Sequence, residues 1–264
     1  MKSVVLISPN LVVQRNDPFT TGIVYMPVGL AYIAAALRDA DIPVRVIDAF
    51  AEKPRQAHRV DTFSLMGLID AEVVARIPED TGMIFIFAIN LTSHVSTIAI
   101  LRALKAEYPH LPVVILENTQ AVTAYSLQKV MAEFFEQGAD YVLTGEGEHR
   151  TVELVQHVWE QSEHKKLEQL EGLGSASFFN PPQNPIQALD ELPFPAWDLF
   201  PLENYWDLRF AHGPQRDNRY LPLLTSRGCP YPCRFCVVPF TNQQKWRARS
   251  ASNIVDEMEY YVNT

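Results

Sequence analysis

The stretch Met83-Ile84-Phe85-Ile86-Phe87-Ala88 decides the predicted fold of this chain. Every position in it is apolar, and a more polar stretch begins at Asn90. A strand that is apolar throughout is buried on both faces, which is typical of a central strand in a parallel sheet. We therefore place residues 83–88 at the centre of an α/β domain.

Short apolar runs on either side of this stretch are predicted to be strands of the same sheet: residues 4–7, 43–48, 112–116 and 140–143. The segments between and after the strands are predicted to be helices: residues 26–38, 62–77, 93–108, 123–137 and 147–161. Strands that alternate with helices through short connections predict a doubly wound parallel sheet, Rossmann- or flavodoxin-like, over residues 1–162.

The composition changes after this unit. Residues 163–206 are rich in proline and are predicted to form a linker, with a weak strand at 175–179. Phe194 and Trp197 are expected to pin the flanking domains together. A second domain is predicted over residues 207–264, with a strand at 219–226 and a helix that begins at Ser250.

Composition narrows the class of protein. The chain has 264 residues, 47% of them hydrophobic, and a net charge of −9, so we expect a globular protein without a nucleic-acid partner. It contains no apolar run of the length that a membrane-spanning helix needs. Clustered cysteines with no partners elsewhere favour a reducing, cytoplasmic location.

All three cysteines lie between Cys229 and Cys236, with the spacing Cys-x-x-x-Cys-x-x-Cys through Cys233. An odd number of cysteines cannot pair internally, and soft thiolates select zinc or iron–sulfur clusters. A structural zinc needs four protein ligands, whereas a cubane cluster held by three cysteines keeps one iron open. A zinc knuckle with a distant fourth ligand and a metal-free loop remain alternatives.

With Ser226-Arg227-Gly228 before it and Phe235 inside it, this stretch resembles the signature of radical S-adenosylmethionine (SAM) enzymes. The resemblance implies that Cys229, Cys233 and Cys236 hold a 4Fe-4S cluster whose open iron chelates SAM. It also implies reductive cleavage of SAM to a 5′-deoxyadenosyl radical, with Phe235 near the adenine. An external electron donor such as flavodoxin or ferredoxin and a small-molecule substrate are further expectations.

The catalytic domain of that family resembles a partial (β/α)6 barrel. Even a complete eight-fold barrel takes about 250 residues, so residues 207–264 are expected to hold only the first β-α unit of a truncated barrel. Either the chain is a fragment, or the remainder of the barrel is on another chain.

Ligands of open α/β sheets bind at the carboxyl ends of the strands. The absence of a Gly-x-Gly-x-x-Gly run after the first strand argues against a dinucleotide. Glu146 and Glu148 are interpreted as charges at a helix N-terminus more than as an acid/base pair. The candidate ligand-binding residues at the strand ends are Ser8, Pro9, Asn10, Asn90, Thr92, Ser93, Glu117, Asn118, Thr144, Gly145, Glu146 and Gly147.

The order of parts resembles the cobalamin-binding radical SAM enzymes. The resemblance rests on residues 27–32, 139–148 and 189–198, followed by the cysteine loop. It implies that the strand-end loops hold cobalamin with its upper face toward the cluster and SAM, and that the reaction is a methyl transfer or a related one. In that family the fourth strand ends in paired glycines that admit the nucleotide tail of cobalamin. Here Glu117 and Asn118 stand in that place.

Three hypotheses follow. The first is a cobalamin-dependent radical SAM enzyme, methyltransferase-like, or part of one. The second is a radical SAM protein whose first domain binds no cobalamin. The third is a non-catalytic Rossmann-like binding module left by truncation. His94 is expected to be an ordinary residue at a helix start, Arg247 and Arg249 are expected on a solvated strand edge, and Arg227 is either a partner of the cysteine loop or a surface residue.

Overall fold

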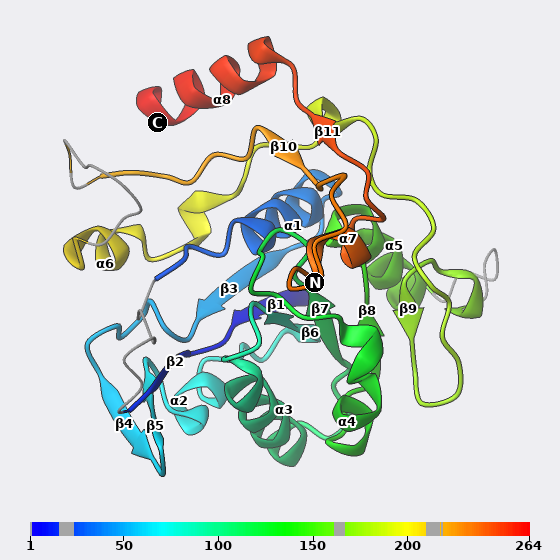
Figure 1. Cartoon of the computed structure of the whole chain (residues 1–264). Coiled ribbons are helices and arrows are strands. Elements are labelled where there is room, and N and C mark those ends of the chain that lie inside the picture. Colours follow the sequence, from blue (N-terminus) through cyan, green and yellow to red (C-terminus); the bar gives the residue numbers. More distant parts are fainter. Residues whose placement is uncertain (1, 16–23, 161–166, 210–216, 218) are drawn as a thin grey trace.

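A six-stranded, mostly parallel sheet forms the centre of the protein (Figure 1). The computed structural model describes residues 2–15, 24–160, 167–209, 217 and 219–264. The strands lie in the order β3-β1-β6-β7-β8-β9, and the first five are parallel while β9 is antiparallel to β8. The order of the five parallel strands is that of a flavodoxin-like sheet, as predicted. Their bounds are β1 Ser3–Ser8, β3 Val44–Asp48, β6 Thr81–Ala88, β7 Val113–Glu117, β8 Tyr141–Leu143 and β9 Leu173–Gly174.

Helices cover both faces of this sheet (Figure 1). The helices α1 (Val28–Asp39) and α5 (Gly147–Glu160) pack together on one face. The helices α2 (Asp70–Val74), α3 (His94–Glu107) and α4 (Met131–Glu136) lie on the other face. Two hydrophobic cores result, and successive residues of β6 enter them alternately, because side chains of a strand point to opposite faces. This is why every position of the stretch 83–88 is apolar.

The helix predicted over residues 62–77 is wrong. The strands β2 (Leu11–Gln14), β5 (Phe63–Met66) and β4 (Ala57–Val60) form a separate antiparallel sheet, and only α2 of the predicted helix exists. Gly67 follows β5 with φ +120°, where a Cβ would lie 2.1 Å from the Ala49 carbonyl oxygen. Pairing with the distant strand β2 thus overrides the local helical pattern. The helix predicted over 123–137 is also shorter than expected, because it consists of the 3-10 turn η1 (Leu127–Lys129) and α4.

The proline-rich segment packs against the sheet. It contains β9, three 3-10 turns and α6 (Leu202–Asp207), and the strand predicted at 175–179 is reduced to one bridge between Phe179 and Gly174. Trp197 is 2% exposed in the core beneath α1, and the Phe194 ring lies 5.8 Å from the Tyr260 ring in a tilted arrangement. The turns are η2 Leu167–Gln169, η3 Leu189–Glu191 and η4 Trp197–Leu199.

The C-terminal segment forms a short hairpin and a helix. The strands β10 (Ser226–Arg227) and β11 (Arg247–Ala248) pair antiparallel, and the cysteines and α7 (Val238–Thr241) lie between them. The strand predicted at 219–226 is wrong except at its end. Ser250 caps α8 (Ala251–Asn263) by accepting a 3.2 Å hydrogen bond from the Asn253 amide, at the start predicted for this helix. Of the helices in the described residues, none is long and apolar enough to cross a membrane.

Candidate functional site

A cavity of about 300 Å³ opens at the carboxyl ends of β6 and β7, beside the first turn of α1. Its walls are mostly apolar, and the polar side chains among them come from the loops that follow these strands. Gly29 allows the walls to close, because a Cβ at this position would lie 3.2 Å from the Phe87 ring. The cavity is lined by, among others, Phe87, Asn90, Asn118, Gln120 and Val122.

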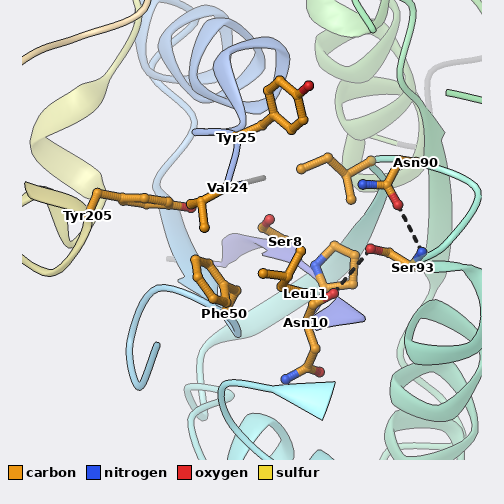
Figure 2. Close-up of a pocket in the computed structure, with 11 residues that line it drawn as sticks. Ser8, Asn10, Leu11, Val24, Tyr25, Phe50, Asn90, Ser93 and Tyr205 are labelled. Carbon is orange, nitrogen blue, oxygen red and sulfur yellow. Dashed lines mark hydrogen bonds between the residues drawn. The ribbon is translucent and has the colours of Figure 1, made fainter. Parts of the chain in front are cut away.

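A smaller cavity of about 20 Å³ adjoins it at the ends of β1 and β6 (Figure 2). The two cavities share Tyr25, Ile89 and Asn90. The Asn90 carboxamide oxygen accepts hydrogen bonds from the Ser93 amide at 2.9 Å and the Thr92 hydroxyl at 2.8 Å. Figure 2 shows the Asn90 amide nitrogen on the side away from Ser93. That nitrogen is therefore available to donate to an acceptor on a ligand.

The structure brings together three of the predicted strand-end loops. Ser8, Pro9, Asn10, Asn90 and Ser93 line the smaller cavity, and Asn90 and Asn118 line the larger one. Thr92 is exposed and lines neither. Ser93 donates to the Asn10 carbonyl oxygen at 3.1 Å, so its hydroxyl joins two loops. The ends of β1 and β6 thus meet at the smaller cavity, and those of β6 and β7 at the larger one.

Glu117 lines neither cavity but ties the end of β7 to the segments that follow β7 and β8. Its carboxylate accepts hydrogen bonds from the Leu127 amide at 2.9 Å and the Gly145 amide at 2.7 Å. Burial raises the pKa of Glu117, and the two amide donors oppose that rise. The Asn118 carboxamide also forms hydrogen bonds within the chain. It donates to the Ile89 carbonyl oxygen at 2.7 Å and accepts from the Gln120 amide at 2.9 Å.

The loop after β8 is covered by the cysteine hairpin instead of lining a cavity. Thr144 donates to the Gly172 carbonyl oxygen at 3.0 Å, and Gly147 packs against Ile33, where a Cβ would lie at 2.7 Å. Glu146 is 3% exposed and forms a two-pronged ion pair with Arg247, at 2.8 and 2.9 Å. The interpretation of Glu146 and Glu148 as simple helix-end charges misses this pairing, since no local pattern shows a partner about a hundred residues away.

Arg227, Arg247 and Arg249 are buried, contrary to the prediction of a solvated edge for the last two. Arg227 lies 2.7 Å from a Glu148 oxygen and 4.8 Å from the centre of the Tyr32 ring. Arg249 pairs with Glu257 and donates to the Tyr32 hydroxyl at 3.1 Å. Burial raises the pKa of Tyr32 to about 12, and Glu257 adds to the rise. Tyr32 and Glu257 were not found by sequence reasoning.

The cysteine loop itself is open. Cys233 is exposed, Cys229 and Cys236 are half-buried, and none of the three is in a disulfide. Phe235 is 84% exposed. Within the described part of the chain no three His, Cys, Asp or Glu side chains lie close enough together to hold a metal ion. The three thiols of this loop therefore do not point to a common position. The donor set, three free thiols without a fourth ligand, nevertheless suits a cluster with three protein ligands better than a structural zinc.

Asn242 joins the cysteine hairpin to the cavity wall. Its side chain is fully buried, donates to the Thr119 carbonyl oxygen at 2.8 Å and accepts from Arg247 at 3.1 Å. Thr119 lies between Asn118 and Gln120, which both line the larger cavity. The hairpin therefore contacts the wall of the cavity directly. No feature of the sequence around Asn242 indicated this role.

His94 is not aimed at either cavity. Its ring nitrogens lie 2.9 Å from the Tyr125 hydroxyl and 3.3 Å from a Glu133 oxygen, and its ring packs edge-on against Phe134. The prediction of an ordinary residue at a helix start is confirmed.

Two relatives that match nearly the whole chain are named as methyltransferases. No family model matches the chain. A cytidylyl-2-hydroxyethylphosphonate methyltransferase of Streptomyces wedmorensis is 28% identical over 97% of this chain and 52% of its own length. An uncharacterized methyltransferase of Pyrococcus horikoshii is 28% identical over 98% of this chain and 50% of its own length. The chain thus spans about half the length of these curated relatives.

Two further likenesses are more limited. A tRNA-2-methylthio-N(6)-dimethylallyladenosine synthase of a Hydrogenobaculum species is 40% identical over 24% of this chain. The solved structure of the radical SAM methyltransferase TsrM from Kitasatospora setae, with tryptophan substrate and a SAM analogue bound, superposes with a TM-score of 0.61. It covers 98% of this chain and 45% of TsrM at 20% identity, so the likeness is one of fold.

Proposed function

We propose that this chain carries the α/β domain, with its cavity at the strand ends, and the cysteine loop of a radical SAM methyltransferase. The observation that carries the proposal is the docking of a three-cysteine hairpin beside a ligand-sized cavity at the carboxyl edge of the sheet, through Asn242. The methyltransferase relatives and the fold shared with TsrM support it.

In this proposal Cys229, Cys233 and Cys236 hold a 4Fe-4S cluster, and SAM is the methyl or radical source. When bound, such a cluster supplies the single electron for reductive cleavage of SAM. The chain's own residues shape the surroundings: Phe235 offers an exposed aromatic face to the adenine, and Arg227 is buried two residues before the first thiol. The domain division at residues 162 and 206 and the start of a partial barrel after it belong to the same proposal.

Cobalamin fits the structure only in part. The apolar cavity suits one edge of a flat macrocycle, and the Asn90 amide can donate to it. A nucleotide tail finds no free place beside the carboxyl ends of β7 and β8, because the buried Glu117 carboxylate lies there and accepts from both nearby amides. We propose cobalamin as a ligand only with its tail elsewhere. The second candidate, a radical SAM protein that binds no cobalamin, is favoured by the same Glu117.

The cluster is tested by anaerobic reconstitution with ferrous iron and sulfide. The wild type is expected to bind about four irons per chain and to show broad iron–sulfur absorption, and Cys229→Ala, Cys233→Ala and Cys236→Ala are each expected to lose most of it. Arg234→Ala, an exposed residue of the same loop, is the matched control. Full retention of the absorption in Cys233→Ala would contradict the assignment. Cleavage of SAM by this chain alone would exclude a non-catalytic binding module.

The ligand of the cavity is tested separately. The purified chain is mixed with hydroxocobalamin without oxygen, desalted, and examined by visible absorption. Retention of cobalamin near one per chain is expected if it is the cofactor. No retention leaves the cobalamin-free radical SAM protein as the better description.

A further inference from the structure

Two arginines face each other across the hairpin that carries the cysteines. Arg227 of β10 lies directly opposite Arg247 of β11, and this pair adjoins the only other ladder pair of the hairpin, Ser226 and Ala248. The arginines are 4% and 7% exposed. Like charges directly opposite on neighbouring strands destabilise a strand pair, and a two-stranded hairpin is marginal alone. The hairpin therefore needs counter-charges from elsewhere in the protein.

The counter-charges come from the loop after β8. Glu146 accepts from both terminal nitrogens of Arg247, at 2.8 and 2.9 Å, and lies 3.6 Å from Arg227. Glu148 lies 2.7 Å from the same Arg227 nitrogen. A planar guanidinium and a carboxylate joined by two parallel hydrogen bonds define an orientation as well as a distance.

Glu146 also accepts a 2.6 Å hydrogen bond from the Ile186 amide. One buried carboxylate thus joins the sheet, the proline-rich segment and the cysteine hairpin. Arg247 continues the connection to Asn242, and Asn242 reaches the Thr119 carbonyl oxygen at the wall of the cavity.

We propose that Glu146 is a positioning residue of the cysteine loop. Its charge permits Arg227 and Arg247 to face each other, and its orientation fixes where the hairpin sits on the carboxyl edge of the sheet. It thereby sets the place of the three thiols relative to the strand-end cavity. This inference rests on the proposed function for the role of the thiols, but not for the docking of the hairpin.

The docking is tested by amide hydrogen exchange on the whole chain without iron. Glu146→Gln removes the charge and leaves two buried guanidiniums with one neighbouring carboxylate. Loss of one partner of a buried pair is costly, so exchange in residues 226–249 is expected to rise about 100-fold. A smaller rise is expected at residues 117–121, through Asn242, and none at residues 83–88. Glu146→Asp keeps the charge and is expected to restore part of the protection. Glu168→Gln, at an exposed position, is the matched control.

The positioning of the thiols is tested by iron uptake of the same variants after addition of ferrous iron and sulfide. Glu146→Gln is expected to hold less than about a third of the iron of the wild type, and Glu146→Asp an intermediate amount. Unchanged exchange at 226–249, or an equal rise throughout the sheet, would overturn the proposal. So would an opened hairpin that still takes up iron as the wild type does. If the wild type takes up no iron while the hairpin opens in Glu146→Gln, the proposed function fails and the docking role stands.

Discussion

The Glu117 carboxylate accepts a 2.7 Å hydrogen bond from the amide of Gly145, which ties the end of β7 to the end of β8. A second amide, that of Leu127, is bound to the other carboxylate oxygen. Two backbone donors, one in the loop after β8 and one at the start of η1, are a ready place for the acceptor groups of a ligand. In this protein the chain's own side chain occupies them, so a ligand of the adjacent cavity gains nothing from them.

Glu117→Gly should therefore change which corrinoids the protein retains. We expect the wild type to retain cobinamide, which lacks the nucleotide tail, as well as it retains cobalamin. In Glu117→Gly the freed amides and space should favour cobalamin over cobinamide by about tenfold, the effect of one or two added hydrogen bonds. Equilibrium dialysis with each corrinoid measures the ratio. A strong preference of the wild type for cobalamin would show that the tail already contributes to binding.

The same substitution should weaken the fold. It leaves the buried amides of Gly145 and Leu127 without an acceptor, and we expect the free energy of unfolding to fall by about 3 kcal/mol. Urea unfolding measures this loss, and the dialysis above is therefore done at a temperature where the variant is folded. No loss of stability would mean that water satisfies both amides.

Val122→Trp should block the larger cavity. Val122 lines the cavity and is 57% exposed, so a larger side chain can be accommodated without disturbing the core. We expect an unfolding free energy within about 0.5 kcal/mol of the wild type and a loss of corrinoid retention of at least about tenfold. Val95→Trp, at an exposed position of α3 outside both cavities, is the control. Equal retention in both variants would place the ligand elsewhere.

Phe235→Ala should separate ligand binding from stability. At 84% exposure the ring contributes little to the fold, so unfolding is expected to change by less than about 0.5 kcal/mol. If the ring packs on the adenine of SAM, its loss should weaken SAM binding to the reconstituted protein by about tenfold. Calorimetry with SAM measures this, with Phe240→Ala, a half-exposed ring of the same hairpin, as the control. An unchanged affinity would remove Phe235 from the SAM site.

Asp48 gives the protein a pH-dependent stability. Burial raises the pKa of this carboxyl from 3.8 to about 6, although hydrogen bonds from the Tyr205 hydroxyl and the Ala51 amide oppose the rise. Because the folded pKa is the higher one, the stabilising contribution is complete below the unfolded pKa and is lost as pH rises through about 6.

Asp48→Asn should remove this dependence, because the amide can still accept from Ala51 and can donate to the Tyr205 oxygen. Between about pH 4 and about pH 7.5 the wild type should lose about 2.5 kcal/mol relative to this variant. Urea unfolding at both pH values measures the difference. Asp198→Asn, which alters a surface pair with Arg38, is the control and should show no such trend. Parallel behaviour of the wild type and Asp48→Asn would refute the prediction.

The sequence was sufficient for the central sheet because burial on both faces leaves a local mark. Residues 83–88 are apolar at every position, and the strands that flank them are short apolar runs between turn residues. Chain order and short connections then restrict the strand order. The same reasoning failed for the helix predicted over 62–77, because β5 within it pairs with β2, which lies more than forty residues earlier in the chain.

The cysteine spacing and the loops at the strand ends could likewise be predicted, since each is a local feature of the sequence. By itself the sequence determined a parallel α/β sheet, a three-thiol loop and a set of polar loops at the strand ends. Only the tertiary structure decided which loops share a cavity, that Glu117 accepts from the Gly145 amide, and that Glu146 pairs with Arg247. The physical reason is that a charged residue far from its partner in the chain has no local sequence signal that distinguishes it from a solvated one. The energy of a buried ion pair depends on contacts that only folding makes.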